Sequence, residues 1–431
     1  MPLRRRQFLK NSINTVAAGL VFPTLIPADA LGLGKRPAPS NRITLGLIGA
    51  GWGLGTAGKF LRFSETQLTG VCDVDAIRAK NAAVAIQRYR PDSQITIFSD
   101  FREMLAKKSL DAVIIATPDH WHGPMCIAAA RAGVDIYAEA PLSRNPVEGR
   151  AIVKTVHLHG RIFQCGLTHR SSHEWDHAVK IAKNGVLGNI THIEIGALPT
   201  PAYPTRKPAP DALRIPKHLN YDAWVGPARW HDYDPRFIPH YWRWVSAFGG
   251  GELASSTFHY VDSALRGIAM EHSGPSIISG TAQFATFPPY DVELTYNSQL
   301  TFQNGIQMQI STEFPRGVKY IGDRGWLHVS DASTNTPLLH ASSPEILQST
   351  ENDPPISPVD HWQDFLDSIK HRRNPRAPAE PAHRAATITQ LAHTAMLLGR
   401  RLHWNPNTET ISNDANASAL LSPDYRQPWS I

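Results

Sequence analysis

Two glycines and an aspartate have the spacing of a dinucleotide-binding site. Gly49 and Gly51 follow the apolar run 43–48, which we expect to form a buried parallel strand, and they open a predicted helix. The first glycine would permit a tight turn, and the second would let the backbone approach a pyrophosphate at the N-terminus of the helix. Asp73 ends the next predicted strand, 22 residues after Gly51, where a carboxylate can bond both hydroxyls of a ribose. The alternative is a glycine-rich turn without a ligand, and Asp73 argues against it.

The same segment predicts which dinucleotide is bound. A carboxylate at Asp73 would repel a 2′-phosphate, so NAD is favoured over NADP, although Arg78 leaves some room for NADP. The strict G-x-G-x-x-G pattern is not met, because Leu54 holds the third position and the glycine follows at Gly55. This departure concerns the packing of the helix on the strand more than the contact with phosphate.

His259 and Asp262 are candidates for proton chemistry. They lie three residues apart in a predicted helix and so share a face, which would let Asp262 orient the imidazole of His259. The alternative is a histidine at a helix start that is bonded locally. His120 and His122 lie two apart on a predicted loop, but no carboxylate or cysteine completes a ligand set with them, so we expect no metal site.

The first part of the chain alternates short apolar runs with helical patterns. Predicted strands cover 43–48, 68–72, 111–116 and 134–138. Predicted helices follow the glycine turn to about residue 63 and cover 76–89, 124–132 and 146–159. Elements that alternate at this spacing argue for an α/β fold with a doubly wound sheet, the Rossmann arrangement.

The pattern changes after Gln164. Longer alternating or β-rich segments at 190–195, 277–284, 292–302 and 305–312 indicate a C-terminal α+β domain with a mainly antiparallel sheet. Helices are expected at 360–371 and 382–401. Residues 199–250 are rich in Pro, Trp, Tyr and Arg, and a loop insertion of that length often shapes a binding site.

These patterns divide the chain into a dinucleotide-binding domain and a second domain. We expect the first at 42–165, a substrate and oligomerisation domain at 166–403, and a tail at 404–431 that packs on the body.

Residues 116–122 read Ala-Thr-Pro-Asp-His-Trp-His, and residues 111–150 as a whole resemble the cofactor domain of the Gfo/Idh/MocA oxidoreductases. In one large subgroup of that family a near-identical run lines the side of the nicotinamide ribose. The resemblance covers nearly all of the chain after Ser40 and implies an NAD-binding oxidoreductase that acts on a carbohydrate or polyol. The cofactor contacts that it implies are Gly49, Gly51, Trp52, Asp73, Thr117, Pro118, His120, His122 and Glu139.

One departure from the family pattern bears on catalysis. Where the family usually carries Glu-Lys-Pro, this chain has Glu139 and Ala140 before the proline, and the family's lysine sits beside the nicotinamide and the reacting hydroxyl. Ser255 stands where relatives usually have an aspartate, whereas His259 and Asp262 match. Loss of general acid–base help costs about 10²–10⁴-fold in rate, so a replacement is needed. The resemblance implies His259 as the main acid/base group, supported by Asp262, with Glu139 as the second candidate.

Arg170, Tyr241 and Arg243 join His259 as the predicted substrate contacts. Arg170 lies in the stretch 166–172, and the other two lie in the aromatic-rich stretch 224–244; both stretches resemble the subgroup. Aromatic rings there would suit stacking against sugar faces, with Arg243 bonding hydroxyls or a carboxylate. Ordinary packing of an aromatic-rich loop explains the same composition equally well.

Composition bounds the class of protein. The chain has 431 residues, 42% hydrophobic and 19% charged, which is ordinary for a globular protein and long enough for two cores. Its formal charge of +6 is concentrated at the N-terminus, where the first 30 residues carry +3, and no dense basic run follows. Nucleic-acid binding therefore has little support. Cys72, Cys126 and Cys165 have no metal or disulfide spacing, so we expect buried free thiols.

The N-terminal segment predicts export. Arg5 and Arg6 begin a pattern that closely resembles a twin-arginine signal, followed by an apolar stretch at 13–26 and a small-residue cleavage site at 28–30. We expect residues 1–30 to be the signal peptide, 31–41 a linker, and the mature protein a periplasmic one without a membrane span. A membrane-anchoring helix is the alternative, which Pro23 and Pro27 weaken because they interrupt a segment already short for a bilayer.

Three functions fit these observations. The first is a hydride-transferring oxidoreductase with a carbohydrate or polyol substrate and a retained NAD, expected as a homo-oligomer. The second is a redox-neutral enzyme that resembles the NAD-dependent glycoside hydrolases of this superfamily. An exported enzyme lacks the cytoplasmic NAD pool, which favours a closed cycle of that kind. The third is a catalytically degenerate binding subunit, since Ala140 and Ser255 have each replaced an ionisable residue.

Overall fold

The computed structural model describes residues 36–431 apart from 108, 202, 204–205, 332–336, 350–359 and 423. Arg5, Arg6 and the rest of the predicted signal peptide lie outside the described residues, so export stays a prediction. Residues 1–42 and residues 43–431 form two units, and the second holds both sheets of the fold.

A parallel sheet carries the dinucleotide-binding pattern. Its strands are hydrogen-bonded in the order β3-β2-β1-β4-β5-β6. Their bounds are β1 Ile43–Ile48, β2 Thr66–Cys72, β3 Thr96–Phe98, β4 Ala112–Ile115, β5 Asp135–Ala138 and β6 Phe163–Cys165. The strand order reverses between β1 and β4, and in such sheets ligands bind outside the carboxyl ends of the strands at the point of reversal.

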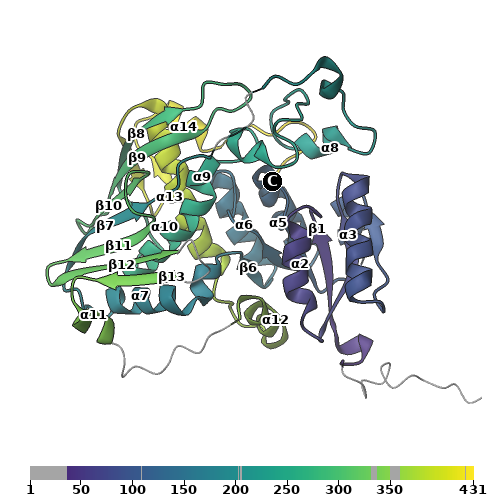
Figure 1. The fold of residues 1–431 in the computed structure, drawn as a ribbon, viewed down its shortest axis with the longest axis horizontal. Coiled ribbons are helices and arrows are strands. Elements are labelled where there is room, and N and C mark those ends of the chain that lie inside the picture. The colour runs from purple at the N-terminus through teal and green to yellow at the C-terminus, as the bar shows by residue number, and fades with distance from the viewer. Residues whose placement is uncertain are drawn as a thin grey trace, which may run out of the picture. The chain divides into compact units, whose positions relative to one another are not determined.

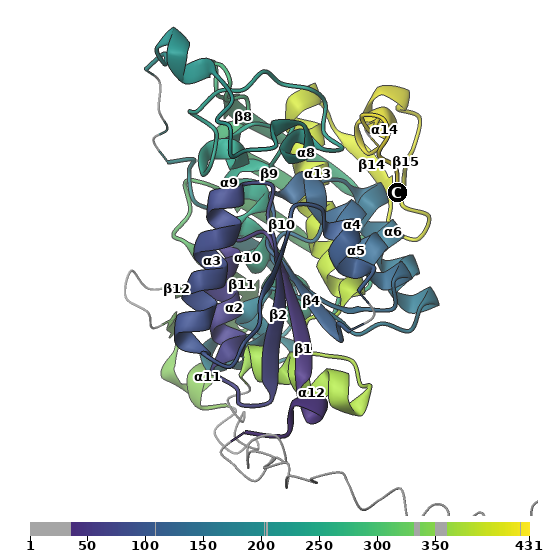
Figure 2. The same ribbon diagram turned by 90° about the vertical axis from the view of Figure 1, so that its right-hand side faces the viewer.

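Helices cover both faces of this sheet, which is why its central strands read as continuous apolar runs. Figure 2 shows α2 and α3 on one face and α4, α5 and α6 on the other. Their bounds are α2 Gly53–Leu61, α3 Ala76–Tyr89, α4 Phe101–Leu105, α5 His122–Arg131 and α6 Pro146–Leu158. Side-chain caps fix two of the helix starts: Asp75 accepts from the backbone of Ile77 and Arg78, and Asn145 accepts from Glu148.

A second, mainly antiparallel sheet follows, with the strand order β13-β12-β11-β7-β10-β9-β8-β14-β15. Its strands are β7 Ile190–Gly196, β8 Ile277–Phe284, β9 Glu293–Thr301, β10 Gln307–Ser311, β11 Gly317–Gly322, β12 Gly325–Asp331, β13 Pro337–Ala341, β14 Leu402–Asn405 and β15 Thr410–Ile411. The β7–β10 pair is parallel. The predicted fold class, a Rossmann sheet plus an α+β domain with a mainly antiparallel sheet, is confirmed.

Helices join the two sheets into one structure (Figure 1). They are α7 His173–Lys183, α10 Ser256–Gly267 and α13 Ala379–Leu398, and they lie against the face of the second sheet that is turned toward α5 and α6. One hydrophobic cluster runs through both sheets, from Ile115 of β4 through Ile152 of α6 and Leu391 of α13 to Leu300 of β9. The sheets are therefore held together by a continuous core.

Short elements complete the unit. They are α8 Tyr221–Val225, α9 Gly251–Ala254, α11 Pro344–Gln348, α12 His361–His371, α14 Ala415–Leu420, η4 Thr168–Ser171 and η6 Tyr241–Trp244.

Helix α12 lies where the sequence did not predict it. Residues 166–403 were expected to form a second domain, yet α12 packs on the parallel sheet, with Phe365 placed 5.9 Å, ring centroid to ring centroid, from both Phe60 and Tyr137. The late part of the chain returns to cover the first sheet because the apolar side of α12 finds its partners there.

The predicted character of the cysteines is confirmed: Cys72, Cys126 and Cys165 are free and buried. Over the residues with described positions, no helix combines the length and the apolar character that crossing a bilayer requires.

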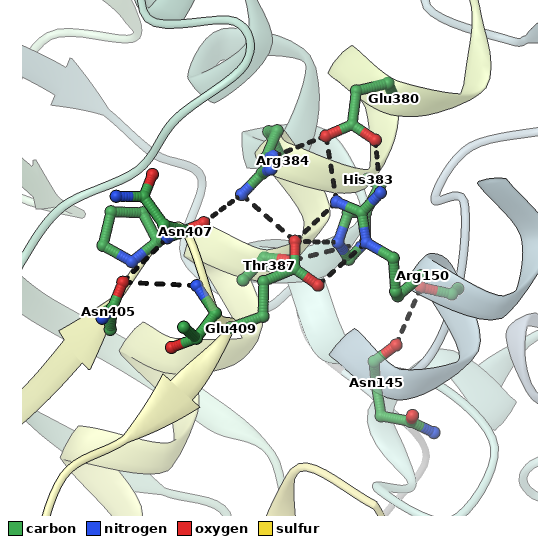
Figure 3. Close-up of polar contacts among 12 residues, drawn as sticks. Asn145, Arg150, Glu380, His383, Arg384, Thr387, Asn405, Asn407 and Glu409 are labelled. Carbon is green, nitrogen blue, oxygen red and sulfur yellow. Dashed lines mark hydrogen bonds and ion pairs between the residues drawn. The ribbon is translucent and has the colours of Figure 1, made fainter. Parts of the chain in front are cut away.

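A network of charged side chains ties the C-terminal hairpin to both domains (Figure 3). Arg150 of α6 donates to Glu380 at 2.5 Å and to Glu409, in the turn between β14 and β15, at 2.6 and 2.9 Å. His383 and Arg384 of α13 contact the same Glu409 carboxylate at 2.8 and 3.1 Å. Only 13% of the Glu409 side chain is exposed, so these contacts are shielded from water. The carboxylate holds the hairpin against α6 and α13.

Replacing Glu409→Gln should destabilise the protein by about 1.5–3 kcal/mol, the range for hydrogen bonds to charged groups. Burial acts to raise the pKa of Glu409, but the bonds from His383 and Arg150 outweigh it and hold the pKa well below its usual range. A depressed carboxyl pKa stabilises the folded state above the unfolded value of about 4.3, and this contribution is lost as the pH falls below it. At neutral pH the free energy of unfolding of the variant should therefore be lower than that of the wild type. The difference should shrink as the pH becomes acidic, as measured by urea unfolding.

Asp211→Asn provides the matched control. Asp211 pairs with Arg214, but their side chains are 88% and 83% exposed, and ion pairs in water contribute little. Equal unfolding free energies for wild type and Glu409→Gln at neutral pH would show that the network does not hold the hairpin.

Candidate active site

The carboxyl ends of β1, β2, β4 and β5 border a cavity of about 540 Å³. Gly49 and Gly51 line it from the β1–α2 turn, Asp73 from the end of β2, Thr117 from the end of β4, and Glu139 from the end of β5. The cavity therefore follows the edge where a doubly wound sheet binds its ligand.

The glycine turn brings backbone closer together than side chains would allow. Gly49 has φ +92°, and a Cβ on it would lie 2.5 Å from the carbonyl oxygen of Ala116. A Cβ on Gly51 would lie 2.9 Å from the guanidinium of Arg78. Both positions leave a cradle of open backbone that a diphosphate can enter.

Gly53 supplies the helix–strand packing that the incomplete motif left in question. A Cβ there would lie 2.9 Å from the Cβ of Ala116 and 3.0 Å from Leu47, whereas a Cβ on Gly55 would meet nothing within 4 Å. The packing glycine is thus Gly53, two residues after Gly51, and Gly55 has no part in this packing.

Asp73 faces the cavity from a fixed position. Its carboxylate accepts from the backbone N–H of Ala50 at 2.7 Å and of Asp75 at 2.9 Å. Burial raises its pKa, and these two hydrogen bonds act in the opposite direction. Each oxygen keeps a second lone pair, so the carboxylate can still accept ribose hydroxyls. Arg78 also lines the cavity, with its Nε 3.5 Å from Asp75.

Glu139 and Ala140 form the opposite end of the cavity. Glu139 accepts a hydrogen bond of 2.5 Å from the hydroxyl of Thr56, and burial raises its pKa. A Cβ on Gly166 would come 2.6 Å from the Glu139 carboxylate and 3.2 Å from the backbone nitrogen of Ala140. Ala140 therefore lies at the wall between this cavity and the segment that begins at Gly166.

Thr117 and Pro118 line the cavity, but His120 and His122 do not. His120 points its ring nitrogens at the carbonyl oxygens of Trp224 (2.9 Å) and Phe248 (3.4 Å), and burial lowers its pKa to about 3. His122 is placed between the carbonyl oxygens of Pro141 at 2.6 Å and Thr117 at 3.0 Å. The prediction that both histidines touch the cofactor is corrected: they fix the loops behind it.

The insertion 199–250 roofs the cavity at the Asp73 end. Backbone bonds join it to the β2–α3 corner, from Ala76 to the carbonyl oxygen of His218 and from Asn220 to that of Val74, at 3.0 and 2.9 Å. Leu219, Trp224 and Trp242 line the cavity from this insertion, and Trp429 lines it from the tail. The predicted packing of the tail on the body is seen where Trp429 meets Trp121, ring centroids 4.7 Å apart.

Arg243 lies at the cavity, as the substrate prediction requires, but Tyr241 and Arg170 do not. Arg243 sits over the rings of Trp242 and Trp52 at 4.3 and 5.6 Å. Tyr241 packs against Trp244 instead, at 5.2 Å between ring centroids. Most aromatic rings of the insertion are buried in one cluster, so ordinary packing explains them better than sugar stacking.

Arg170 and Asp262 form a buried ion pair. Both oxygens of Asp262 accept from Arg170, at 2.6 and 2.8 Å, and Glu271 accepts from the same guanidinium at 2.9 Å. The prediction that Asp262 holds the ring of His259 is therefore corrected: sharing a helix face with His259 did not prevent Asp262 from pairing with an arginine far away in sequence. Arg170 is likewise a structural residue and not a substrate contact.

A second cavity, of about 260 Å³, contains His259. The side chains around it are nearly all polar and are Thr168, His169, Ser255, Ser256, His259, Tyr260, Arg316 and Asp331. Burial, followed by the nearby His169, lowers the pKa of His259 to about 3. Thr168 lines this cavity, and Gly166, two residues earlier, lies against Glu139 and Ala140, which line the larger one.

The sequence did not predict His169 and Asp331, which line this cavity together with His259. His169 and Asp331 lie 3.2 Å apart, nitrogen to oxygen, and come from η4 and the end of β12. Neither sits in a motif, and the only signal in the sequence was the position of His169 beside Arg170. Thr56 and Asp119 of the larger cavity were also missed, although Asp119 lies within the run Thr-Pro-Asp-His-Trp-His.

The site fits a dinucleotide and gives no support to a metal. The glycine cradle, the fixed Asp73 and Glu139 line the cavity in the order in which the parts of NAD lie along a Rossmann edge. Among the described residues, no group of three His, Cys, Asp or Glu side chains is placed to hold a metal ion.

Comparison with family models identifies both domains. Residues 43–167 match the Gfo/Idh/MocA model described as oxidoreductase family, NAD-binding Rossmann fold. Residues 177–431 match the model described as oxidoreductase family, C-terminal alpha/beta domain.

Curated relatives include glycosyl hydrolase family 109 proteins. Protein 2 of Shewanella sp. (strain ANA-3) is 29% identical over 207 residues, which span 44% of this chain and 45% of the relative. An alpha-N-acetylgalactosaminidase of Shewanella oneidensis is 29% identical over 169 residues, or 36% of this chain and 37% of that protein. The matched part is less than half the length of either relative.

Solved structures of similar fold include sugar-acting enzymes. The aldose–aldose oxidoreductase from Caulobacter crescentus, complexed with glycerol, has a TM-score of 0.63 at 17% identity, over 84% of this chain and 99% of that one. The WlbA dehydrogenase from Bordetella pertussis, in complex with NADH and UDP-GlcNAcA, gives the same four values. At this identity the likeness shows a shared fold.

Proposed function

Because the chain belongs to the Gfo/Idh/MocA oxidoreductase family, we propose that it uses NAD to oxidise a hydroxyl-bearing carbon of a carbohydrate or polyol and keeps the cofactor between turnovers. The observation that carries the proposal is the larger cavity, which offers a glycine cradle, a ribose-binding carboxylate and a polar end at Glu139 along one sheet edge. Bound NAD supplies the hydride acceptor.

Each part of the cofactor has residues suited to it. The backbone at Gly49 and Gly51 would hold the pyrophosphate, Asp73 would accept the adenosine ribose hydroxyls, and Thr117 and Glu139 would flank the nicotinamide end. Trp52 and Arg243, stacked at the mouth of the cavity, would cover the outer side.

Retention follows from the roof over the adenosine end. The backbone bonds of the insertion to Val74 and Ala76 must break, or the cofactor must leave past Trp242 and Trp429, before a dinucleotide can exit. A slow exit suits an enzyme outside the cytoplasm, where free NAD is scarce, and this agrees with the export that Arg5 and Arg6 predict.

The hydroxyl proton needs a base, and Ala140 cannot provide one. His259, which lines the smaller cavity, is the candidate that we favour, and Glu139 lines the larger cavity. Glu139 has a pKa raised by burial, so its carboxyl can hold a proton closer to neutral pH than an exposed glutamate. We assign the main proton transfer to His259 and a polarising role to Glu139.

A redox-neutral glycoside hydrolase is the second candidate. The relatives described as glycosyl hydrolase family 109 proteins favour it, although they match less than half of this chain. In that reaction the sugar is oxidised, loses its glycosidic substituent, gains water and is reduced again, so the cofactor is regenerated in every turnover. Retained NAD suits both candidates.

The purified protein should carry bound NAD. The variant His259→Ala should lose turnover but keep the bound NAD. Denaturing the protein releases the bound cofactor, which chromatography then measures. Turnover is measured by screening sugars, polyols and aryl glycosides for product. The expected fall in rate is about 10²–10⁴-fold, the usual loss for a general acid or base. A variant that matches wild-type turnover would remove the assignment of His259, and a wild-type protein that neither carries nor binds NAD would remove the proposal.

Asp73 should make the site prefer NAD to NADP. Calorimetry on protein stripped of cofactor is expected to show tighter binding of NAD, and Asp73→Ala should reduce that preference because the repulsion of a 2′-phosphate is gone. Arg78→Ala is the matched variant, because Arg78 lines the same cavity and its Nε lies 3.5 Å from Asp75. If the wild type binds NADP more tightly, Arg78 governs the pocket.

Replacing both Arg5 and Arg6 with lysine should leave the precursor in the cytoplasm with its cofactor loaded. Twin-arginine export carries folded proteins, and a nucleotide fold cannot reload outside the cell. Fractionation and immunoblotting of wild type and variant measure the outcome. Normal export of the lysine variant would contradict the localisation.

A further inference from the structure

We propose that His169, held by Asp331, accepts the proton that His259 takes from the substrate, so that two histidines and a carboxylate form a proton path in the smaller cavity. The inference rests on the proposed function, in which a substrate hydroxyl reacts beside His259. It adds a residue that neither the glycine motif nor the helix around His259 indicates.

The ring of His169 is fixed in place from two sides. It stacks on Trp175 with ring centroids 4.0 Å apart and an interplanar angle of 6°. Its Nε2 lies 3.2 Å from Oδ1 of Asp331, the oxygen that also accepts from Nε1 of Trp175 at 3.2 Å. Because a carboxylate accepts, the neutral ring carries its proton on Nε2 and its lone pair on Nδ1.

Asp331 is itself firmly held. Its other oxygen accepts from the hydroxyl of Tyr260 at 2.8 Å and from Arg316 at 3.2 Å. Burial acts to raise the pKa of Asp331, but the bond from His169 and the contacts with Tyr260 and Arg316 outweigh it, so the carboxyl stays ionised. An ionised carboxylate in contact stabilises a positive charge on the ring of His169.

His259 and His169 each bury one nitrogen without a partner, and it is Nδ1 in both rings. Among the described residues neither Nδ1 has a hydrogen-bond partner. The ring centroids are 5.3 Å apart and the rings are tilted by 54°. Leaving a buried polar nitrogen without a partner costs free energy. When His259 carries its proton on Nδ1, it offers an N–H donor, and Nδ1 of His169 offers a lone pair that can accept.

The proton path explains how His259 can accept a proton from the substrate although its pKa is low. Burial and the neighbouring His169 lower the pKa of His259 to about 3, so this ring cannot keep a second proton at neutral pH. The charged and titratable groups around the two rings are Asp331, Arg316, Tyr260 and His361, with Glu252 behind Arg316. Among them only the His169–Asp331 pair combines an imidazole lone pair with an adjacent carboxylate.

The proton balance is simple. The substrate O–H proton bonds to Nε2 of His259 as hydride leaves the carbon, and the proton on Nδ1 of His259 moves to Nδ1 of His169. The positive charge then rests on His169 beside Asp331. The reverse movement returns the proton when hydride comes back to the substrate.

Nuclear magnetic resonance of the full-length protein labelled with ¹⁵N-histidine tests the path without a substrate. The ring signals that vanish in His169→Gln identify His169, and they should show a neutral ring protonated on Nε2. Asp331→Asn should remove this tautomer preference, whereas the exposed His403→Gln should leave the remaining signals unchanged. A neutral His169 protonated on Nδ1 has no lone pair to offer and would overturn the proposal.

Kinetics on the substrate found by the screen give the second readout. His169→Gln keeps a donor for Asp331 but cannot carry a proton, so kcat should fall about 100-fold, within the range for lost acid–base help, with KM unchanged. Asp331→Asn should lower kcat in the same direction and Asp331→Glu should restore part of it. If His259→Ala loses turnover but His169→Gln keeps a normal kcat, the proton path is contradicted and the role of His259 stands. If both variants turn over normally, the role of His259 is contradicted as well.

Discussion

The approach of Gly49 to the backbone of Ala116 is the contact on which the site depends. With a φ of +92° and no side chain, Gly49 lets the turn after β1 lie against the end of β4, where the strand order of the sheet reverses. The carboxyl ends of both strands then open into one cavity, and Gly53 lets α2 pack close behind them. Any side chain at Gly49 would push β1 and β4 apart and close the cradle that the pyrophosphate requires.

Burial then decides what each polar residue near that edge can do. Arg170 and Asp262 neutralise one another, and Arg150 is satisfied by Glu380 and Glu409. In each of these pairs the opposite charges compensate one another, and the pair holds the elements that carry it together. His169 and His259 differ from these pairs, because Nδ1 of each imidazole has no hydrogen-bond partner among the described residues and both rings line the smaller cavity.

Local pattern predicted the elements well and the side-chain partners poorly. The run 43–48 and the helix 76–89 have the predicted bounds, because apolar spacing and a capping Asp75 are encoded in neighbouring residues. The pairing of Asp262 with Arg170, the return of Phe365 to the first sheet and the contact of His169 with Asp331 join residues far apart in sequence. Helical spacing could state that Asp262 and His259 share a face, but not that a buried arginine competes for the same carboxylate.

Ala140 has a different meaning once the second cavity is taken into account. In isolation, the absence of the family lysine suggests a decayed enzyme. Decay would be expected to leave a cavity that is filled or apolar, since no selection would maintain costly buried polar groups. The smaller cavity instead keeps His169, His259, Arg316 and Asp331 in a polar arrangement directly behind the wall at Gly166. A histidine path and an alanine at this position are therefore compatible parts of one site.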